Sequence, residues 1–309
     1  MDNEKDYIIQ CENLIKIYKS SDIEVVALQG LDLSIEQGEL TAIIGNSGSG
    51  KSTLLNMIGC LDKPTAGKLV VDGKDLFKLS KNDITKYKRD TIGFVWQNNA
   101  RNLIPYLSAL ENIELSLSIG KNKNKRERAI ELLEMVGMSH RKNNILSELS
   151  GGEQQRIAIA IALSNNPKIL LADEPTGSVD TATSNQILGL FRELNEKFNL
   201  TVIIVTHDRQ IASKVNRVVA IRDGKTSSEF IRKRSYAEEL QNLKEGSVNS
   251  EEETHVELAV LDKAGRLQIP RDYLSALGLE DKNKIKIELD KDRIVLYSPE
   301  ANTNEEKVG

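Results

Sequence analysis

A glycine-rich segment at residues 45–53 carries the first pattern in this sequence that could do chemistry. It reads GNSGSGKST, directly after the apolar run TAII and before a helical run that starts LLNMIG, and it fits the phosphate-loop pattern G-x-x-x-x-G-K-[ST]. Glycines let the backbone curl so that successive N–H groups point at phosphate oxygens, and the N-terminus of the following helix adds its positive dipole end. We predict that Lys51 contacts the β- and γ-phosphates of a nucleotide and that Ser52 holds Mg²⁺. A flexible loop without a ligand is the alternative interpretation.

Two adjacent carboxylates end an apolar run at residues 169–174. The run reads ILLADE and is followed by Pro-Thr-Gly. A solvated turn is the usual setting of an Asp-Glu pair, but the preceding apolar residues place this pair at the end of a strand. A phosphate-loop ATPase needs one acid to position Mg²⁺ and a base to polarise the attacking water. We therefore predict that Asp173 positions Mg²⁺ and that Glu174 is the base.

A second group of small residues, Ser150-Gly151-Gly152, stands directly before the helical run at 154–164. Backbone N–H groups at a helix N-terminus suit an anion when the residues there are small. The sequence therefore contains two candidate phosphate sites, and the second needs an explanation of its own.

Alternating strands and helices must position these residues. Residues 1 to about 230 alternate β-branched runs with longer helical patterns, which predicts an α/β fold. The runs at 41–44, 169–172 and 201–206 are short and nearly all apolar, which is typical of buried parallel strands.

The composition is that of an ordinary folded protein. Of the 309 residues, 39% are hydrophobic and 28% are charged, which excludes the collagen-like, low-complexity and wholly disordered classes. The 42 basic and 46 acidic residues give a formal net charge of −4, which argues against a chain that binds nucleic acid over its whole length. Aromatic residues make up only 4%, so the core must be aliphatic.

Cysteine usage and apolar run lengths bear on the compartment. Cys11 and Cys60 lie far apart in the sequence, which excludes a CxxC metal or redox motif and fits a reducing compartment. The start, MDNEKDYIIQ, is acidic, so we expect no secretory signal. The longest apolar runs, such as IAIAIAL, fall short of the roughly 18 residues that a membrane helix needs. We expect a chain that stays inside the cell and reaches a membrane only through another protein.

The segment LSGGEQQR at 149–156 resembles the signature motif of ATP-binding-cassette (ABC) ATPases. Counterparts of the Walker A, Q-loop, signature, Walker B, D-loop and H-loop motifs all occur here in the order and approximate spacing of that family. The resemblance implies a P-loop NTPase fold, an ABC ATPase domain with a helical subdomain. It also explains the second small-residue group, because Ser150 and Gly152 would face the γ-phosphate bound to the Walker A loop of another copy. The implied active form is a head-to-tail homodimer with two ATP molecules sandwiched between its subunits.

Further positions match the motifs of the family one by one. Tyr18 in LIKIYKS matches the aromatic residue that stacks on adenine, with a half-buried strand residue as the alternative. Gln97 in GFVWQ matches the Q-loop glutamine that reaches Mg²⁺ and water and links to a membrane partner. Ser178 and Asp180 in TGSVD match the D-loop, which crosses the dimer interface. His207 after TVIIVT matches the switch histidine that contacts the γ-phosphate.

The resemblance thus implies an ATPase that uses ATP and Mg²⁺. Its catalytic residues would be Lys51, Gln97, Glu174 and His207. Mg²⁺ would be held by Ser52, Gln97 and Asp173. The residues that bind ATP would be Tyr18, Gly45, Asn46, Ser47, Gly48, Ser49, Gly50, Lys51, Ser52, Thr53, Ser150, Gly151, Gly152 and Asp180. Closure of the sandwich on ATP and its opening after hydrolysis would drive a partner between two states.

Three further sequence segments indicate a particular branch of the family. LDKPTAGKLVVDG (61–73), NLIPYLSALENI (102–113) and ADEPTGSVD (172–180) resemble the macrolide-export and lipoprotein-release branch, of MacB/LolD/FtsE type. That branch implies an ATP-hydrolysing subunit of an export or mechanotransmission complex, which works peripherally at the cytoplasmic face of the cell membrane and drives a separate integral-membrane permease of FtsX/MacB type. The chain departs from the branch in two places, since NNAR (98–101) lengthens the loop after Gln97, and Trp96 stands where Phe is commoner.

A second hypothesis comes from a different class, a soluble ABC-type ATPase that regulates a DNA or ribosome partner. Ribosome-associated members of the family usually carry two cassettes in one chain, and this chain has one. The basic run KNKNKRER at 121–128 has no interleaved aromatic residues, so a solvated helix start is a better interpretation than an RNA or lipid site. We expect no nucleic-acid partner.

The C-terminal part predicts a small domain of its own. We place the ATP-binding domain at 1–230, a polar stretch with a short helix and a linker at 231–253, a small mainly-β domain at 254–299, and a disordered tail at 300–309. Within the small domain, a first hairpin, the short amphipathic stretch RDYLSALG and a second hairpin follow one another.

DKAGRLQIPRDYLSALGL at 262–279 resembles the swapped-hairpin domains of AbrB/MazE type, in which two chains interleave. Many of those domains bind DNA through basic residues. Residues 251–309 hold nine basic residues against fourteen acidic ones, a balance that disfavours DNA. We therefore expect this domain to dimerise the chain and to keep two ATPase domains at high local concentration.

Overall fold

The computed structural model divides the chain into two compact units, Met1–Leu258 and Ala259–Gly309. The residues described within them are 6–20, 23–97, 102–120, 123–208, 211, 214–232, 255–261, 265, 267, 269, 271–279, 285–291 and 293–297. Every residue that the sequence assigns to chemistry lies in the first unit.

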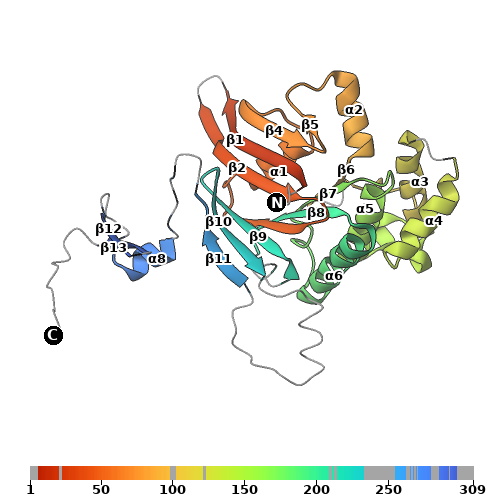
Figure 1. The fold of residues 1–309 in the computed structure, drawn as a ribbon. Coiled ribbons are helices and arrows are strands. Elements are labelled where there is room, and N and C mark those ends of the chain that lie inside the picture. The colour runs from red at the N-terminus through yellow and green to blue at the C-terminus, as the bar shows by residue number, and fades with distance from the viewer. Residues whose placement is uncertain are drawn as a thin grey trace. The chain divides into compact units, whose positions relative to one another are not determined.

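A seven-stranded sheet forms the centre of the first unit (Figure 1). Five neighbouring strands run parallel in the order β9-β3-β8-β7-β6, and β10 adds antiparallel to β9. The strands are β3 (Leu40–Ile44), β6 (Ile92–Val95), β7 (Ile169–Asp173), β8 (Thr201–Thr206), β9 (Arg217–Arg222), β10 (Lys225–Arg232) and, at the edge beside β10, β11 (His255–Ala259). Residues of β3 and β8 are buried throughout, and in β7 all but Asp173 are. The prediction of three buried parallel strands is confirmed.

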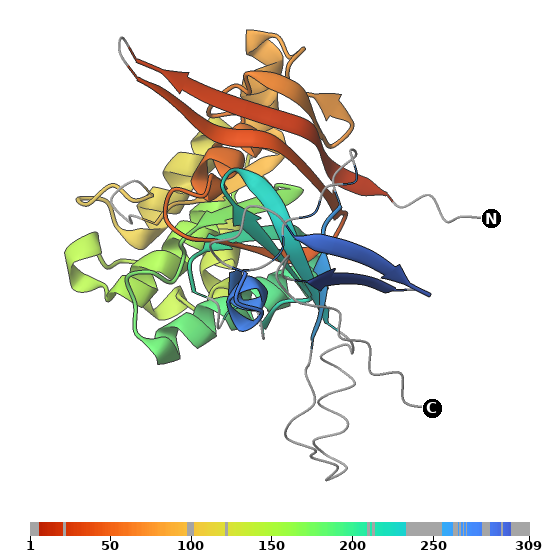
Figure 2. The same cartoon turned by 90° about the vertical axis from the view of Figure 1, so that its left-hand side faces the viewer.

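Side chains of the central sheet alternate between two apolar clusters, because successive residues of a strand point to opposite faces. Ile43, Leu171 and Ile203 join one cluster, with the helix α1 (Lys51–Ile58) and a second, antiparallel sheet. That sheet has the order β2-β1-β4-β5, and Figure 2 shows its two long strands, β1 and β2, from the side. Its strands are β1 (Tyr7–Lys19), β2 (Glu24–Glu36), β4 (Ala66–Val71) and β5 (Lys74–Asp75). The helix α1 therefore contributes to the core between two sheets.

The second apolar cluster lies between the other face of the sheet and a group of helices. Ala42, Leu170 and Ile204 point to this side and pack with apolar residues of α3, α4, α5 and α6 (Figure 1). The longer helices are α2 (Lys81–Asp90), α3 (Ala109–Ile119), α4 (Lys125–Met135), α5 (Gly151–Ala162) and α6 (Thr181–Phe198), with single 3₁₀ turns at Ser139–Arg141 and Leu146–Glu148. The described part of the basic run leads into α4, which begins at Lys125, and residues 123–127 are exposed, as the prediction of a solvated helix start requires.

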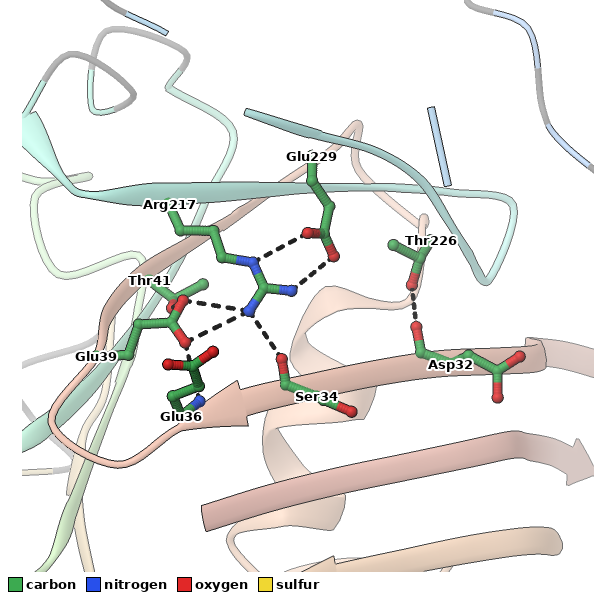
Figure 3. A network of polar contacts seen from close by, with 8 residues as sticks. All are labelled: Asp32, Ser34, Glu36, Glu39, Thr41, Arg217, Thr226 and Glu229. Carbon is green, nitrogen blue, oxygen red and sulfur yellow. Dashed lines mark hydrogen bonds and ion pairs between the residues drawn. The ribbon is translucent and has the colours of Figure 1, made fainter. Parts of the chain in front are cut away.

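A half-buried arginine joins the two sheets of the first unit (Figure 3). Arg217 on β9 donates to the carboxylate of Glu229 on β10, to the carboxylate of Glu39 before β3, and to the carbonyl oxygen of Ser34 on β2, at 2.6, 3.2 and 2.8 Å. Burial acts to lower the pKa of Arg217, but the hydrogen bonds and charges of Glu229 and Glu39 outweigh it, so that pKa lies above its usual range. Close to it, the hydroxyl of Thr226 donates to a carbonyl oxygen of β2. The seam between the sheets is thus held by charge as well as by apolar packing.

The second unit contains a short helix and a hairpin among its described residues. The helix α8 (Arg271–Ala276) precedes Gly278, which has a φ of 64°, and the strands β12 (Lys286–Asp290) and β13 (Arg293–Tyr297) pair antiparallel. The predicted helix and second hairpin are confirmed. Large apolar side chains of this hairpin stand exposed, with Leu289 at 77% and Ile294 at 70%.

The first predicted C-terminal hairpin is described only in part. Leu261 and Leu267 form an antiparallel bridge, whereas β11 lies in the large sheet beside β10, a pairing that the sequence did not predict. The predicted linker lies outside the described residues except for 231–232, and the predicted tail at 300–309 lies outside them completely. The division into domains therefore stays a prediction.

Candidate active site

The glycine-rich loop joins β3 to α1, as the sequence predicts. Gly50 caps α1 with a φ of 102°, and a Cβ there would lie 2.6 Å from the carbonyl oxygen of Ala27. A Cβ at Gly45 would lie 2.3 Å from the carbonyl oxygen of Ile221. Side chains are therefore excluded where the loop crosses neighbouring backbone. The first turn of α1 carries no acidic residue, so its N-terminus is electrostatically suited to an anion.

Lys51 and Ser52 open α1 and face the end of β7. The Lys51 ammonium donates to the carbonyl oxygens of Gly45 and Asn46 at 2.8 and 2.9 Å, which leaves one of its three N–H donors for another acceptor. Burial lowers the pKa of Lys51, and the charges of Glu174 and Asp173 act in the opposite direction. The hydroxyl of Ser52 donates to Oδ1 of Asp173 at 3.0 Å. The loop and the β7 carboxylates thus form one polar cluster.

The Glu174 carboxylate is held from two sides. Its Oε2 accepts a hydrogen bond from the hydroxyl of Thr206 at 3.0 Å, and its Oε1 lies 2.9 Å from Nδ1 of His207. Because an ionised carboxylate can only accept, the contact with His207 places a proton on Nδ1 and leaves Nε2 for another partner. The backbone of Glu174 has a φ of 48°, in the left-handed region, and its N–H donates to the carbonyl oxygen of Val205. The carboxylate is therefore fixed by the end of β8.

Thr206 has its hydroxyl fully used. It is 1% exposed, accepts the backbone N–H of Asp208 at 3.1 Å and donates its one proton to Glu174. In the sequence, this threonine is recognisable only as the end of a strand. Nothing in the run TVIIVT distinguishes its hydroxyl, because the partner carboxylate lies 32 residues away in the chain.

A cavity of about 860 Å³ brings most of the predicted residues together. It is lined by Tyr18, Val25, Val26, Ala27, Asn46, Ser47, Gly48, Gly50, Lys51, Ser52, Thr53, Gln97, Glu174 and His207. Gly45 and Ser49 belong to the loop without lining the cavity, and Asp173 reaches it through Ser52. The Ser49 hydroxyl is buried without a hydrogen-bond partner among the described residues. Gln97 lines the cavity as predicted, but the residues NNAR at 98–101 lie outside the described part of the chain.

One end of the cavity is apolar. Tyr18 on β1 is 41% exposed and stands opposite Val25 on β2, with Val26 and Ala27 beside it. A flat ring in this position can stack on a base, and this role of Tyr18 stays a prediction.

The small residues at 150–152 and Asp180 do not line this cavity. Ser150 caps α5, and its hydroxyl and N–H exchange hydrogen bonds with the N–H and the carboxylate of Glu153. Asp180 caps α6 and accepts from the N–H and hydroxyl of Thr183. The backbone hydrogen bond from Thr183 is the largest of the effects that lower the pKa of Asp180. Their predicted roles require a second copy and stay predictions.

Comparison with known proteins decides the family. A family model described as ABC transporter matches residues 28–177. The chain is 45% identical over 228 residues to the ABC transporter ATP-binding protein MJ0796 of Methanocaldococcus jannaschii, and this match covers 72% of the chain and 96% of that protein. The chain belongs to the ABC transporter ATP-binding family. It is an ABC-type ATPase, as its motifs predict.

Solved structures of ABC cassettes confirm the fold. The dimeric structure of MJ0796 bound to ADP and Pi, a post-hydrolysis state, matches with a TM-score of 0.67 and 43% identity over 74% of this chain and 100% of that one. The structure of cbiO1 from Clostridium perfringens matches with a TM-score of 0.66 and 30% identity over 78% of this chain and 93% of that one. The P-loop NTPase fold of an ABC ATPase is therefore confirmed.

A further relative is much longer than the region that matches this chain. The macrolide export ATP-binding/permease protein MacB of Syntrophobacter fumaroxidans is 45% identical over 221 residues, which cover 70% of this chain and 31% of that protein. The chain thus spans about a third of the length of this ABC relative. Among the described residues of the chain, no helix is both long and apolar enough to cross a membrane.

The Thr206 hydroxyl gives a first test of the site. In a Thr206→Val variant, Glu174 loses the donor that orients Oε2, so we expect kcat for ATP hydrolysis to fall about tenfold while KM for ATP changes little. Steady-state phosphate release over a range of ATP concentrations measures both constants. Thr206→Ser keeps the hydroxyl and is the matched control, expected to retain most of kcat. Equal kcat values for the Val and Ser variants would show that the hydroxyl does not position Glu174.

Proposed function

We propose that the chain is the ATP-hydrolysing subunit of an ABC transporter of export or mechanotransmission type, and that two copies close on two ATP molecules to drive an integral-membrane permease. The observation that carries the ATPase part is the cavity, where Lys51, Glu174 and His207 meet beside an apolar end suited to a base. The phosphate end carries the Lys51 ammonium and the N–H donors of the glycine-rich loop, which suit phosphate groups.

The phosphate end has a donor set that fits Mg²⁺. Ser52 and Asp173 offer a hydroxyl and a carboxylate oxygen that lie 3.0 Å apart, and Gln97 lines the same cavity. Oxygen ligands of this kind, completed by phosphate and water, are what Mg²⁺ prefers. We assign Ser52, Asp173 and Gln97 as the residues that would hold it, and bound Mg²⁺ would neutralise phosphate charge during hydrolysis. Lys51 uses its remaining N–H donor on the β- and γ-phosphates.

Glu174 is the residue that would activate the attacking water. Its carboxylate lines the cavity and is fixed by Thr206 and His207, so it is held ready to accept a proton from a water beside the γ-phosphate. His207 donates through Nδ1 to this carboxylate, and its Nε2 remains to contact the γ-phosphate when protonated. Backbone N–H groups of Asn46, Ser47 and Gly48 would complete the hydrogen bonds to the phosphates.

A second copy would complete the site. In the dimeric relatives, two cassettes associate, and the group Ser150, Gly151 and Gly152 lies away from the cavity of its own chain. We assign this group, with Asp180 and Ser178 nearby in sequence, to the ATP bound by the other copy. A Cβ at Gly151 would meet Ser178 and Val179 at ordinary van der Waals distance, 3.7 Å, whereas a Cβ at Gly152 would lie 2.2 Å from Cγ2 of Thr183. Gly151 can therefore be substituted without disturbing the packing of α5 on α6.

Mixing two inactive variants tests the shared site. Glu174→Gln removes the base, and Gly151→Asp places a negative charge where the γ-phosphate of the other copy would lie, so each variant alone should lose at least about 90% of ATPase activity. In a mixed dimer, one site combines the intact Glu174 of one chain with the intact Gly151 of the other. We expect an equimolar mixture to recover up to about a quarter of the activity of the unmodified chain, because half the dimers are mixed and each has one intact site.

The control for this mixture is Gly151→Ala, which adds a Cβ without a charge and should stay active on its own. The measurement is phosphate release at a fixed total protein concentration. A mixture no more active than the average of its two components would show that each chain completes its own site.

The permease partner is proposed from the relatives. The MacB relatives are named as ATP-binding/permease proteins. This chain matches 31% and 36% of the length of two of them. We propose that the chain pairs with a permease of FtsX/MacB type as a separate protein, at the cytoplasmic face of the cell membrane. The longer loop after Gln97, at 98–101, would adapt the cassette to its particular permease.

Recovery of the partner tests this pairing. The Glu174→Gln chain should accumulate in the ATP-closed state, so with Mg-ATP it should capture an FtsX-like or MacB-like permease in stoichiometric amount from detergent-solubilised membranes. Mass spectrometry identifies the captured proteins, and Lys51→Ala, which should not bind ATP, is the matched control. Recovery of ribosomal proteins or DNA alone would favour the second hypothesis, a regulator of a DNA or ribosome partner.

The second unit supports a dimerising role. Leu289 and Ile294 pair across the β12–β13 hairpin and are 77% and 70% exposed, and Ile287 beside them is 64% exposed. An exposed apolar row on a two-stranded hairpin needs a covering partner, because an isolated hairpin is marginally stable in water. We propose that a second copy covers it, as in the AbrB/MazE-like domains that 262–279 resemble, and that the domain at 254–299 raises the local concentration of the cassettes.

Activity at low protein concentration tests the second unit. Deletion of residues 260–309, which keeps β11 in the large sheet, or the pair Leu289→Asp and Ile294→Asp, should raise at least about tenfold the protein concentration at which ATPase activity is half maximal. Asp290→Asn at the end of the same strand is the matched control and should leave that concentration unchanged. If the deletion left it unchanged as well, the second unit would have no part in dimerisation.

A further inference from the structure

The Tyr18 ring is held by a lysine on one of its faces. Nζ of Lys16 lies 4.6 Å from the centre of the Tyr18 ring, within the range of a cation–π interaction. Lys16 is 8% exposed, so its ammonium is shielded from water and the attraction to the ring is correspondingly stronger. The ring itself is 41% exposed, so the opposite face is the one available to a ligand.

The Tyr18 hydroxyl is fixed by a carboxylate on a distant segment. It donates to Oδ2 of Asp62 at 2.8 Å, and the other oxygen of Asp62 accepts from Nζ of Lys16 at 2.7 Å. Lys16 also donates to the carbonyl oxygen of Lys63 at 2.8 Å. Burial of Tyr18, followed by its hydrogen bond to Asp62, raises the pKa of the phenol. The ring is thus held at its face by the lysine and at its edge by the carboxylate.

Asp62 is itself held in place from within its segment. Its N–H donates to the carbonyl oxygen of Asn56, in the last turns of α1, and its Oδ1 accepts the backbone N–H of Lys63 at 2.7 Å. Burial acts to raise the pKa of Asp62, but the hydrogen bonds from Lys16, Tyr18 and Lys63 outweigh it and hold that pKa below its usual range. The carboxylate therefore stays ionised and ties the Tyr18 ring to the helix that carries Lys51.

The lining beside Tyr18 is apolar except for Thr53, whose side chain hydrogen-bonds Tyr18 itself. Val25 and Val26, 53% and 46% exposed, and Ala27 supply no hydrogen-bond donor or acceptor in their side chains. The Tyr18 hydroxyl is already engaged by Asp62. A base at this end is therefore placed by stacking on the Tyr18 ring, and the energy of that contact depends on how firmly the ring is held before the ligand arrives.

We propose that Lys16 and Asp62 are positioning residues that fix the Tyr18 ring as a preformed stacking platform for the base of the nucleotide, an inference that rests on the proposed role of Tyr18 in ATP binding. They act through the ring and touch no phosphate group. Their loss should weaken ligands that carry a base and spare ligands that consist of phosphates alone.

The test compares ATP with inorganic tripolyphosphate as ligands of the full chain. Lys16→Met keeps the aliphatic stem and removes the ammonium, and Asp62→Asn keeps the shape and removes the charge. In each variant we expect the dissociation constant for Mg-ATP to rise about tenfold and that for Mg-tripolyphosphate to stay within about twofold, as measured by titration calorimetry. Lys68→Met is the matched control, because Lys68 forms an exposed ion pair with Glu12 on the same sheet, at 2.9 Å, outside the cavity.

A Tyr18→Ala variant distinguishes a failure of the positioning role of Lys16 and Asp62 from a failure of the stacking role of Tyr18. If Tyr18→Ala weakens ATP relative to tripolyphosphate but Lys16→Met and Asp62→Asn do not, the positioning role is overturned and the proposed function stands. If Lys16→Met and Asp62→Asn weaken both ligands equally, these residues support the fold and the positioning role is again overturned. If Tyr18→Ala leaves the ratio of the two dissociation constants unchanged, the stacking role of Tyr18 in the proposed function fails.

Discussion

The geometry of parallel strands is the constraint on which this site depends. β3, β8 and β7 are hydrogen-bonded neighbours that run in the same direction, so their carboxyl ends reach one edge of the sheet. The phosphate loop follows β3, Glu174 follows β7, and His207 follows β8. Segments separated by more than a hundred residues are thereby placed within hydrogen-bond distance of one another, as the Ser52–Asp173 contact shows. Apolar clusters pack on both faces of the sheet and so hold the ends of these strands in fixed positions.

The cavity of one chain brings together residues of the glycine-rich loop, Glu174 and His207, but the second small-residue group lies outside it. The N-terminus of α5 is occupied by the carboxylate of Glu153 from its own first turn. That carboxylate satisfies the helix end in the isolated chain. In the proposed dimer, the same helix end would face the nucleotide bound by the other copy.

Contiguous sequence motifs predicted most of the residues in this site. Residues that act on partners far away in the sequence could not be predicted. The loop residues, Asp173, Glu174 and His207 stand in contiguous motifs next to strands whose apolar runs are unmistakable, so their convergence could be predicted from the sequence. Thr206 and Asp62 could not be found in that way, because their hydroxyl and carboxylate act on partners 32 and 44 residues away. The edge position of β11 was missed for a related reason, since alternation predicts a strand but does not choose its neighbour.

The seam around Arg217 also has a thermal consequence. It joins β9 and β10 to β2 through a half-buried arginine between two carboxylates, beside a core made mostly of aliphatic side chains. The cost of removing charged groups from water falls on heating, while the stabilisation from apolar burial reaches a plateau. The link between the two sheets therefore loses less strength on warming than an apolar seam of the same size would.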